Sequence, residues 1–291
     1  MAKKCLIIAN PISGLGFGRR NAPLLETQLR ENGYEVELFW TTAQGAARAA
    51  AEEANADDVS VILCVGGDGT LNEIVNGVGD KRIPVTIFPT GTGNVLAKEY
   101  GIPYNVSRVC EMIVHDRTKW LDVGVIGNRR FILFAGAGFD AAVTMSLHRR
   151  RTGRISMLSY VSPVLRALVT YRFPEIEVRV DGQFAGTATC VIVSNVHSYG
   201  GPFEFTQQAD PTDGLLDVCL MRGRSRWDLV RYMWGGLRRR LLRYEDTKHL
   251  RGAVIELDSK SEVPLQADGD FIGNSPVKIE LLHARLPVIV P

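Results

Sequence analysis

An apolar segment that runs directly into a glycine-rich turn is the feature that most constrains the fold. Residues 59–65 read Val-Ser-Val-Ile-Leu-Cys-Val, which has the length and character of a buried strand. Gly66-Gly-Asp-Gly-Thr70 follows at once, and we expect a helix from Thr70, with Thr70 and Glu73 spaced as a capping box. Glycine lets the backbone approach a bulky anion, and helix N-terminal amides favour phosphate. Three glycines around one aspartate therefore favour a phosphate-binding turn over a plain tight turn.

Strand-like and helix-like segments alternate over the first 120 or so residues. Such alternation predicts βαβ units and a mostly parallel sheet, in which ligands bind at the carboxyl ends of the strands. Three loops rich in glycine and hydroxyl residues follow strands at this edge, and together they favour a phosphate cradle: Asn10–Gly14, Gly66–Thr70 and Pro89–Asn94. The expected strands are Lys4–Ala9, Glu35–Trp40, Val59–Val65 and Ile83–Phe88, and the expected helices are Arg19–Asn32, Gln44–Asn55 and Thr70–Val78.

The pattern changes after about residue 120. Apolar and polar residues alternate with a period of two over Glu175–Asp181, which predicts antiparallel β structure. We therefore expect a second, β-rich domain. Its further strands are expected at Gly186–Ser194, Leu215–Met221 and Gly252–Asp258, and helices near Phe139–His148, Arg154–Thr170 and Arg226–Arg243. The last segment, Pro276–Pro291, is again strand-like, and the residues alone assign it to neither domain.

Composition excludes several classes of protein. Apolar residues make up 45% and charged residues 23%, and no apolar run approaches the length of a membrane span. The five histidines are isolated, which disfavours a zinc site, and a net charge of +2 gives no indication of nucleic-acid binding. The five cysteines form no C-x-x-C pair, so we expect buried, reduced thiols and a cytoplasmic protein: Cys5, Cys64, Cys110, Cys190 and Cys219.

Two clusters of carboxylates lie in the second half of the chain. Asp210-Pro-Thr-Asp213-Gly-Leu-Leu-Asp217 places carboxylates three residues apart around a glycine turn, which suits either a hard cation or an ordinary β-turn. Asp268-Gly-Asp270 contains an Asp-Gly pair, which by itself predicts the turn of a β-hairpin. If the fold brings Asp268 beside the glycine loops, that aspartate has the chemistry to accept a hydroxyl proton.

A basic segment with a tryptophan-bearing apolar stripe follows. Residues 222–251 contain ten Lys or Arg and only three Asp or Glu, and Ser225 with Asp228 is spaced as a capping box. A basic amphipathic helix bearing Trp suits an anionic membrane surface. The same stripe suits packing against the β domain, which the residues alone slightly favour, and His148–Arg151 with Arg154 forms a second basic patch. The stripe recurs at spacings of three and four: Trp227, Val230, Trp234, Leu237 and Leu241.

Taken together, these motifs resemble the bacterial soluble lipid kinases of the diacylglycerol-kinase catalytic family, relatives of sphingosine and ceramide kinases. The resemblance spans nearly the whole chain, although the Gly-Gly-Asp-Gly-Thr loop is shared with NAD kinases. Two departures stand out: Asp270 occupies a position that is usually Glu, and Asn94 is followed by Val-Leu rather than by a segment with Phe. The matching segments are Asn10–Gly14, Gly66–Glu73 with Asn76-Gly77, Pro89–Asn94, Gly136–Asp140, Asp210–Asp217 and Asp268-Gly269.

The resemblance implies an N-terminal Rossmann-like nucleotide-binding α/β domain (residues 1–121, joined by about 276–291) and a C-terminal antiparallel β-sandwich for the lipid (residues 122–275), with the active site in the cleft between them. It makes Asp268 the proton acceptor and places Asp68, the second catalytic residue, close to the phosphates and their Mg²⁺. It implies a structural Mg²⁺ site formed by Asp210, Asp213 and the Leu215 carbonyl. The implied ATP contacts are Asn10, Thr41, Gly66, Gly67, Asp68, Gly69, Thr70, Leu71, Asn72, Glu73 and Thr92.

The expected function is transfer of the γ-phosphate of ATP, with Mg²⁺, to a lipid hydroxyl, by default that of a diacylglycerol. NAD kinase and a catalytically silent nucleotide- or lipid-binding protein are the alternatives. The expected partner is the lipid at the inner membrane face, reached through peripheral contact of Arg222–Arg251. No nucleic acid is expected as a partner, and a homodimer stays open.

Overall fold

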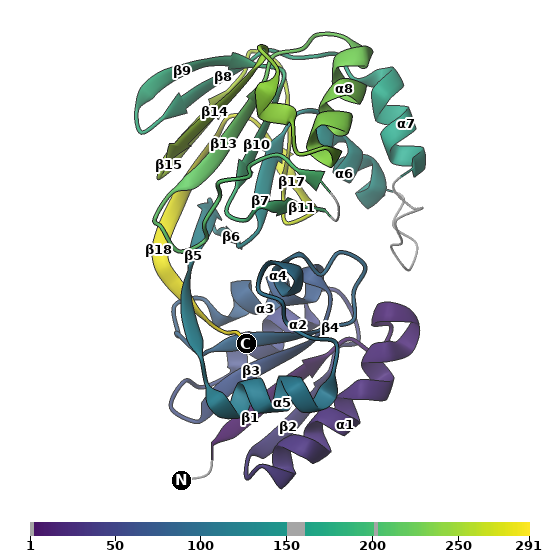
Figure 1. The fold of residues 1–291 in the computed structure, drawn as a ribbon, viewed down its shortest axis with the longest axis vertical. Helices are drawn as coiled ribbons and strands as arrows, with labels where there is room; N and C mark the ends of the chain where they lie inside the picture. The colour runs from purple at the N-terminus through teal and green to yellow at the C-terminus, as the bar shows by residue number, and fades with distance from the viewer. Residues whose placement is uncertain (1–2, 150–160, 201–202) are drawn as a thin grey trace. The chain divides into compact units, whose positions relative to one another are not determined.

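The computed structural model describes residues 3–149, 161–200 and 203–291, which form two compact units (Figure 1). The first unit runs to Leu121 and takes up the chain again at Ala284–Pro291, and the second comprises Asp122–His283. The strand β18 (Val277–Ile289) therefore begins in the second unit and ends in the first. The sequence-based boundary assigned all of residues 276–291 to the first domain, whereas only the last eight belong to that unit.

A parallel sheet forms the centre of the first unit, in the order β2-β1-β3-β4-β18. The apolar run at residues 59–65 forms β3, and all of its residues except Ser60 are buried, because helices cover both faces of a parallel sheet. The alternation predicted from the sequence is confirmed. The strands are β1 (Lys4–Ala9), β2 (Glu35–Trp40), β3 (Val59–Gly66) and β4 (Val85–Pro89), and the helices are η1 (Ser13–Gly16), α1 (Phe17–Glu31), α2 (Ala46–Glu53), α3 (Asp68–Val78), α4 (Val95–Glu99) and α5 (Val106–His115).

One local prediction in this unit is wrong. Helix α3 begins at Asp68, and its N-cap is Gly67, which provides no side-chain cap. The predicted capping box of Thr70 and Glu73 does not form. The Glu73 carboxylate instead accepts the N–H groups of Gly45 and Ala47, at 3.0 and 3.2 Å, and so satisfies free amides at the start of α2.

The second unit is a β-sandwich, as expected. One layer is the six-stranded antiparallel sheet β14-β13-β10-β7-β16-β17, and the facing layer contains β18, β15, β8 and β9, with β5 and β6. Alternate side chains of both layers form one buried core. The strands are β5 (Thr118–Ile126), β6 (Arg129–Phe131), β7 (Phe134–Ala137), β8 (Ile176–Val180), β9 (Gln183–Ala188), β10 (Cys190–Ser194), β13 (Leu216–Met221), β14 (Thr247–Gly252), β15 (Val254–Asp258), β16 (Pro264–Ala267) and β17 (Asp270–Asn274), with a small pair of β11 (Ser198–Tyr199) and β12 (Phe203–Glu204).

Three helices cover the outer face of the six-stranded sheet: α6 (Phe139–Arg149), α7 (Val161–Thr170) and α8 (Arg226–Leu237) (Figure 1). Their inner side chains form a second core with the outward side chains of β10 and β13. The expected helix over 154–170 is described only from Val161, and its earlier residues lie outside the described ranges. So do residues 150–154 and the side chain of His148, on which the second basic patch depends.

Helix α8 is shorter than predicted. The expected helix over 226–243 ends at Leu237, because Arg239 adopts a φ of 55° and the chain turns back, with the Arg240 N–H bonded to the Gly235 carbonyl. The 3₁₀ turn η3 (Leu241–Arg243) follows. The predicted capping box of Ser225 and Asp228 is confirmed. Within the described ranges, no helix has the length and apolar character that crossing a bilayer needs.

All five cysteines are buried and unpaired, as predicted. They lie in the two sheets and in α5, among apolar side chains. Burial raises the pKa of Cys5, Cys110 and Cys219 to about 12. These thiols are therefore part of the packing and are unsuited to nucleophilic chemistry.

Candidate active site

Three glycine-rich loops meet at the carboxyl edge of the parallel sheet in the first unit. The Asn10 N–H bonds the Val65 carbonyl at 2.9 Å, and the Thr90 N–H bonds the Gly66 carbonyl at 2.8 Å. The Thr41 N–H bonds the Ala9 carbonyl at 2.9 Å, so the end of β2 joins the same edge. The structure thus brings together the loops that the sequence analysis grouped.

Glycine is required where these loops touch. A Cβ on Gly91 would lie 2.4 Å from the Cα of Gly67, and a Cβ on Gly14 would lie 2.2 Å from the Thr90 carbonyl oxygen. No side chain fits at such separations, so the three backbones pack directly on one another. Hydroxyl contacts add to this packing, because Thr90 donates to the Ser13 hydroxyl at 2.9 Å.

The start of α3 presents backbone amides at this edge. Its first intrahelical bond joins the Leu71 N–H to the Gly67 carbonyl, so the amides of residues 68–70 have no carbonyl partner within the helix. Gly69 is exposed, and no atom lies within 4 Å of the position that its Cβ would occupy. An anion can therefore approach these amides, at the positive end of the helix dipole.

Asp68 links two of the loops. One of its carboxylate oxygens accepts the Val95 N–H at 2.7 Å, at the start of α4. Burial raises the pKa of the Asp68 carboxyl, and the N–H groups of Val95, Asn94 and Leu96 oppose that rise. A Cβ on Gly93 would lie 2.6 Å from its other oxygen, so glycine is needed there to admit the carboxylate. No local pattern in the sequence indicates this link, since the partners are 27 residues apart.

The remaining expected ATP contacts fall into two sets. Asn10, Thr70 and the exposed Thr92 lie in the loops, and the Asn10 amide donates to the Thr70 hydroxyl at 3.4 Å. Leu71 and Asn72 are 1% and 4% exposed, so their side chains belong to the interior. Glu73 is committed to capping α2.

Asp268 stands at the turn between β16 and β17 in the second unit. The hairpin predicted from Asp-Gly is confirmed, and Asp268 adopts a φ of 46° there. Its carboxylate accepts the N–H groups of Ile132, Leu133 and Phe134, each at 3.0 Å, and its own N–H bonds the Phe134 carbonyl at 2.8 Å. A hairpin needs none of these side-chain bonds. They fix the carboxylate in one orientation.

Asp140, a half-buried aspartate, supports this turn. Asp140 accepts hydrogen bonds from the Tyr199 hydroxyl at 2.9 Å and the Gln266 amide at 3.0 Å. The side-chain oxygen of Gln266 in turn accepts the N–H of Gly269, the residue after Asp268, at 3.0 Å. Burial raises the pKa of the Asp140 carboxyl, against the effect of those two donors.

Asp140 belongs to a motif that matches the family, but no role could be assigned to it from the sequence, because its partner Gln266 lies 126 residues away. The spacing of that motif has a physical reason. A Cβ on Gly136 would lie 1.9 Å from an Asp140 oxygen, so only glycine leaves room for the carboxylate. Asp270, on the other side of the turn, pairs with Arg129 at 2.6 Å.

The expected structural metal site is a tight turn. Asp210 accepts the backbone N–H and the hydroxyl of Thr212, at 3.0 and 2.7 Å, and Asp213 accepts the Leu215 N–H at 3.0 Å. The other Asp213 oxygen forms an ion pair with Arg251. Carboxylate and carbonyl oxygens are the ligands that a hard cation prefers. The Arg251 guanidinium occupies the position of a positive charge beside the Asp213 carboxylate.

A buried aspartate that the sequence analysis did not single out stabilises this turn. Asp122 accepts the Gly214 N–H at 2.7 Å and contacts the His283 ring at 2.8 Å. Nearby Asp217 is buried with His249 at 2.6 Å. Among the described residues, no group of three or more His, Cys, Asp or Glu is arranged to hold a metal ion, but the expected site has only two carboxylates and a carbonyl.

Comparisons with known proteins agree with this architecture. A family model described as the diacylglycerol kinase catalytic domain matches residues 4–126, and one described as the YegS C-terminal NAD kinase beta sandwich-like domain matches residues 134–290. The chain is 26% identical to the diacylglycerol kinase of Bacillus subtilis (strain 168), over 99% of this chain and 97% of that protein. It is 27% identical to the diacylglycerol kinase of Staphylococcus haemolyticus (strain JCSC1435), over 100% of this chain and 89% of that protein.

Solved structures share the fold. A crystal structure of a diacylglycerol kinase from Bacillus anthracis str. Sterne matches with a TM-score of 0.76 and 23% identity, over 100% of this chain and 97% of that one. A second structure from the same organism gives a TM-score of 0.81 and 24% identity, over 100% and 95% of the two chains. The two family models and the curated relatives identify a two-unit lipid kinase. The chain belongs to the diacylglycerol kinase catalytic-domain family of lipid kinases.

Proposed function

We propose that this kinase transfers the γ-phosphate of ATP, with Mg²⁺, to the free hydroxyl of a diacylglycerol. The observation that carries the proposal is the half-buried Asp268 carboxylate, held by three backbone N–H groups beside the exposed Gly269. The relatives named as diacylglycerol kinases support the choice of acceptor.

The first unit would bind the nucleotide. The amides at the start of α3 and the packed glycine loops suit the ATP phosphates, and Asn10, Thr41 and Thr92 supply polar groups at the same edge. Asp68 has one oxygen bonded to Val95 and would direct the other toward the Mg²⁺ that accompanies ATP. A bound Mg²⁺ would supply charge neutralisation for the phosphates.

The second unit would bind the lipid and take up the proton. The lipid hydroxyl oxygen attacks the γ-phosphorus while the bond from that phosphorus to the leaving ADP oxygen breaks. The hydroxyl proton passes to Asp268. Since phosphoryl transfer depends mainly on positioning and charge stabilisation, a carboxylate held in a fixed orientation suits this role. The proposal therefore requires both units to present their groups to one pair of substrates.

The turn at Asp210, Asp213 and Leu215 would hold a second, structural Mg²⁺. Its oxygen ligands are of the right type, and cation binding there requires the Asp213–Arg251 ion pair to open or rearrange. This part of the proposal concerns stability and does not contribute to phosphoryl transfer.

NAD kinase is the second candidate, because the C-terminal family model is described as NAD kinase beta sandwich-like. Transfer of labelled phosphate from ATP to a panel of acceptors separates the candidates. The panel contains diacylglycerol, sphingosine, phosphatidylglycerol and NAD, each with and without Mg²⁺. We expect Mg²⁺-dependent label in diacylglycerol. Label in NAD alone, or ATP binding with no label in any acceptor, would contradict the proposal.

A further inference from the structure

Helix α8 presents an apolar stripe to solvent. Trp227 is 81% exposed and Trp234 is 54% exposed, with Val230 and Leu237 between and beyond them at helical spacing. The opposite stripe, with Leu229 and Tyr232, is buried against the sheet. The interpretation that packs the tryptophan stripe on the β domain is therefore wrong for these four residues, and only Leu241 is buried.

Helix α7 extends the same apolar surface. Val161, Leu165 and Val169 recur every four residues and are 52%, 59% and 64% exposed. The two helices are neighbours, since the Arg226 guanidinium at the start of α8 donates to the Val169 carbonyl at 2.8 Å (Figure 1). Isolated exposed apolar side chains are ordinary, but seven on two adjacent helices form an apolar patch of the kind that marks a binding surface. We name this surface the α7–α8 face.

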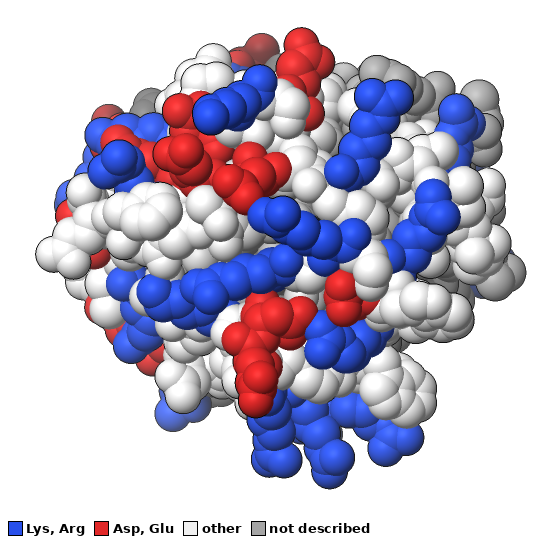
Figure 2. Space-filling model, turned by 90° about the horizontal axis from the view of Figure 1, so that it is seen from above, with Lys and Arg blue, Asp and Glu red and all other residues white. Residues whose placement is uncertain are grey.

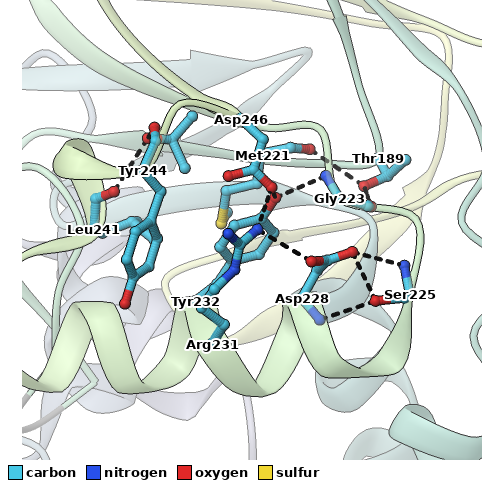
Figure 3. A network of polar contacts seen from close by, with 11 residues as sticks. Thr189, Met221, Gly223, Ser225, Asp228, Arg231, Tyr232, Leu241, Tyr244 and Asp246 are labelled. Carbon is cyan, nitrogen blue, oxygen red and sulfur yellow. Dashed lines mark hydrogen bonds and ion pairs between the residues drawn. The ribbon is translucent and has the colours of Figure 1, made fainter.

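The orientation of α8 is fixed by a polar network (Figure 3). Arg231 forms ion pairs with Asp228 and Asp246, and the Tyr232 hydroxyl donates to Asp246 while it accepts the Gly223 N–H at 2.7 Å. The capping box at Ser225 holds the helix start. The helix therefore has one stable orientation, and its tryptophans do not turn inward.

Two glycines make the opposite side of α8 fit closely. A Cβ on Gly235 would lie 2.7 Å from the Tyr244 ring, and a Cβ on Gly236 would lie 2.7 Å from the Phe205 ring. Two consecutive glycines would weaken an isolated helix. In the structure the pair lets α8 sit close to its neighbours, which again leaves the tryptophan stripe outward.

Arginines are frequent in the segment that carries α8. Figure 2 shows one face of the molecule, on which Lys and Arg side chains lie among uncharged and acidic residues. The Arg238 guanidinium lies over the Trp234 ring, 4.6 Å from its centroid. Arg224, Arg231 and Arg239 have carboxylate partners. Within the described part of the chain, five exposed arginines of this segment form no ion pair: Arg222, Arg226, Arg238, Arg240 and Arg243.

We propose that the α7–α8 face docks on an anionic lipid bilayer. Indole and aliphatic side chains would enter the boundary between headgroups and acyl chains, and the unpaired arginines would contact lipid phosphates. Exposed tryptophans beside arginines that form no ion pair match a bilayer better than a protein surface. At a bilayer the indole rings reach the apolar boundary of the headgroups and the guanidinium groups reach the lipid phosphates. The inference rests on the proposed function in one respect: a diacylglycerol substrate resides in a bilayer.

The test is vesicle co-sedimentation without ATP and without diacylglycerol, so that docking is measured apart from catalysis. Vesicles of phosphatidylglycerol and phosphatidylcholine are compared with vesicles of phosphatidylcholine alone. We expect binding to the anionic vesicles, a blue shift of tryptophan emission on binding, and weakening by salt. The double variant Trp227→Ser/Trp234→Ser should lower the partition coefficient by about tenfold or more, with the blue shift lost.

Matched variants separate this surface from general surface effects. Leu165→Ser is paired with Leu24→Ser, since Leu24 is 56% exposed on α1 and thus equally accessible. Arg238→Glu/Arg240→Glu is paired with Lys260→Glu, an exposed residue outside the face. We expect the first member of each pair to weaken vesicle binding, by about fivefold per reversed charge, and the second to leave it unchanged. All these positions are exposed, so melting temperatures should stay within about 2 °C of the parent protein.

Several outcomes would overturn the proposal. Equal binding to neutral and anionic vesicles, or wild-type binding by the double tryptophan variant, would exclude this face as the docking surface. Absence of vesicle binding together with a concentration-dependent dimer that the tryptophan variant abolishes would identify a protein interface instead. Failure of the phosphoryl-transfer assay leaves the vesicle result intact, so the two proposals fail separately.

Discussion

The two units assemble their parts of the candidate site in opposite ways. In the first unit the useful groups are backbone amides, and glycines bring them together because no side chain fits between the loops. In the second unit the useful group is a side chain, Asp268, and backbone amides hold it in place. The difference shows which substitutions should disturb each unit. The first unit should be sensitive to atoms added at its glycines, and the second to a change in the functional group of Asp268.

Asp68 and Asp268 illustrate the contrast. Both carboxylates accept backbone N–H groups, but Asp68 uses its bond to join two loops, whereas three amides converge on Asp268. Asp68 is thus part of the framework that shapes the loops. We expect substitution of Asp68 to affect folding and nucleotide binding together. Asp268→Asn should lower turnover, and the loss of one backbone N–H acceptor should also lower stability.

The largest expected effect follows replacement of Asp268. Asp268→Asn should lower kcat by at least about a hundredfold, because an amide cannot accept the hydroxyl proton. Circular dichroism and the rate of labelled-phosphate transfer measure fold and turnover. The matched control is Asp270→Asn at the same turn. This substitution weakens the ion pair with Arg129 and should lower kcat by less than about tenfold. A folded Asp268→Asn enzyme with near-wild-type turnover would exclude its role as proton acceptor.

The next effect tests the glycine packing. Gly91→Ala should destabilise the protein by about 1–3 kcal/mol, since its Cβ would lie 2.4 Å from the Cα of Gly67. Gly69→Ala is the control, because its Cβ meets no atom within 4 Å, and alanine in a helix should raise stability by up to about 1 kcal/mol. Urea denaturation of both variants is the measurement. Equal stability would show that the loops adapt and that their contact is not obligatory.

A smaller, pH-dependent effect is expected at Asp140. Burial raises the pKa of this carboxyl in the folded state, so the stability present below the unfolded-state pKa of about 3.9 is lost as pH rises through the folded value. Asp140→Asn removes the ionisation. The melting temperature of the variant minus that of the wild type should therefore grow between about pH 4 and pH 7, to about 2 °C or more.

Turnover of the Asp140→Asn protein should fall less than that of Asp268→Asn, because Asp140 acts only through Gln266 and the Gly269 N–H. A Gln266→Glu variant serves as a second probe of the same link. A melting-temperature difference that is flat with pH would contradict the assigned ionisation.

The smallest effect concerns the turn at Asp213. Asp213→Asn weakens the ion pair with the partly exposed Arg251 and should cost less than about 1 kcal/mol without Mg²⁺. If the turn holds Mg²⁺, the wild-type melting temperature rises with added Mg²⁺ and that of the variant does not. Thermal scans of both proteins, free of nucleotide and with or without added Mg²⁺, make this comparison. An identical Mg²⁺ response in both proteins would exclude the metal site.

The fold class followed from the sequence because both units have strong periodic patterns. Alternating segments predicted the parallel sheet, and the period of two over 175–181 predicted the antiparallel sheets. The glycine loops followed from their place after apolar strands. Local chemistry was less predictable: Glu73 is spaced to cap its own helix, yet it caps α2, a choice that only the tertiary structure decides.

Other misses have the same origin. Helix α8 carries apolar residues on two stripes, so periodicity could not tell which stripe faces the sheet. The answer depends on Gly235 and Gly236, which allow close packing on one side only. The link from Asp140 to Gln266 spans 126 residues and leaves no local signal in the sequence.

The most direct test of the division between the units is the ATP-Mg²⁺ affinity of the folded Asp268→Asn protein, measured by calorimetry beside the wild type. We assign nucleotide binding to the first unit and proton acceptance to the second. We therefore expect a dissociation constant within about twofold of the wild-type value, in a protein whose phosphate transfer to diacylglycerol is nearly abolished. A loss of ATP affinity that parallels the loss of turnover would contradict this assignment, since Asp268 would then act in nucleotide binding rather than as the proton acceptor.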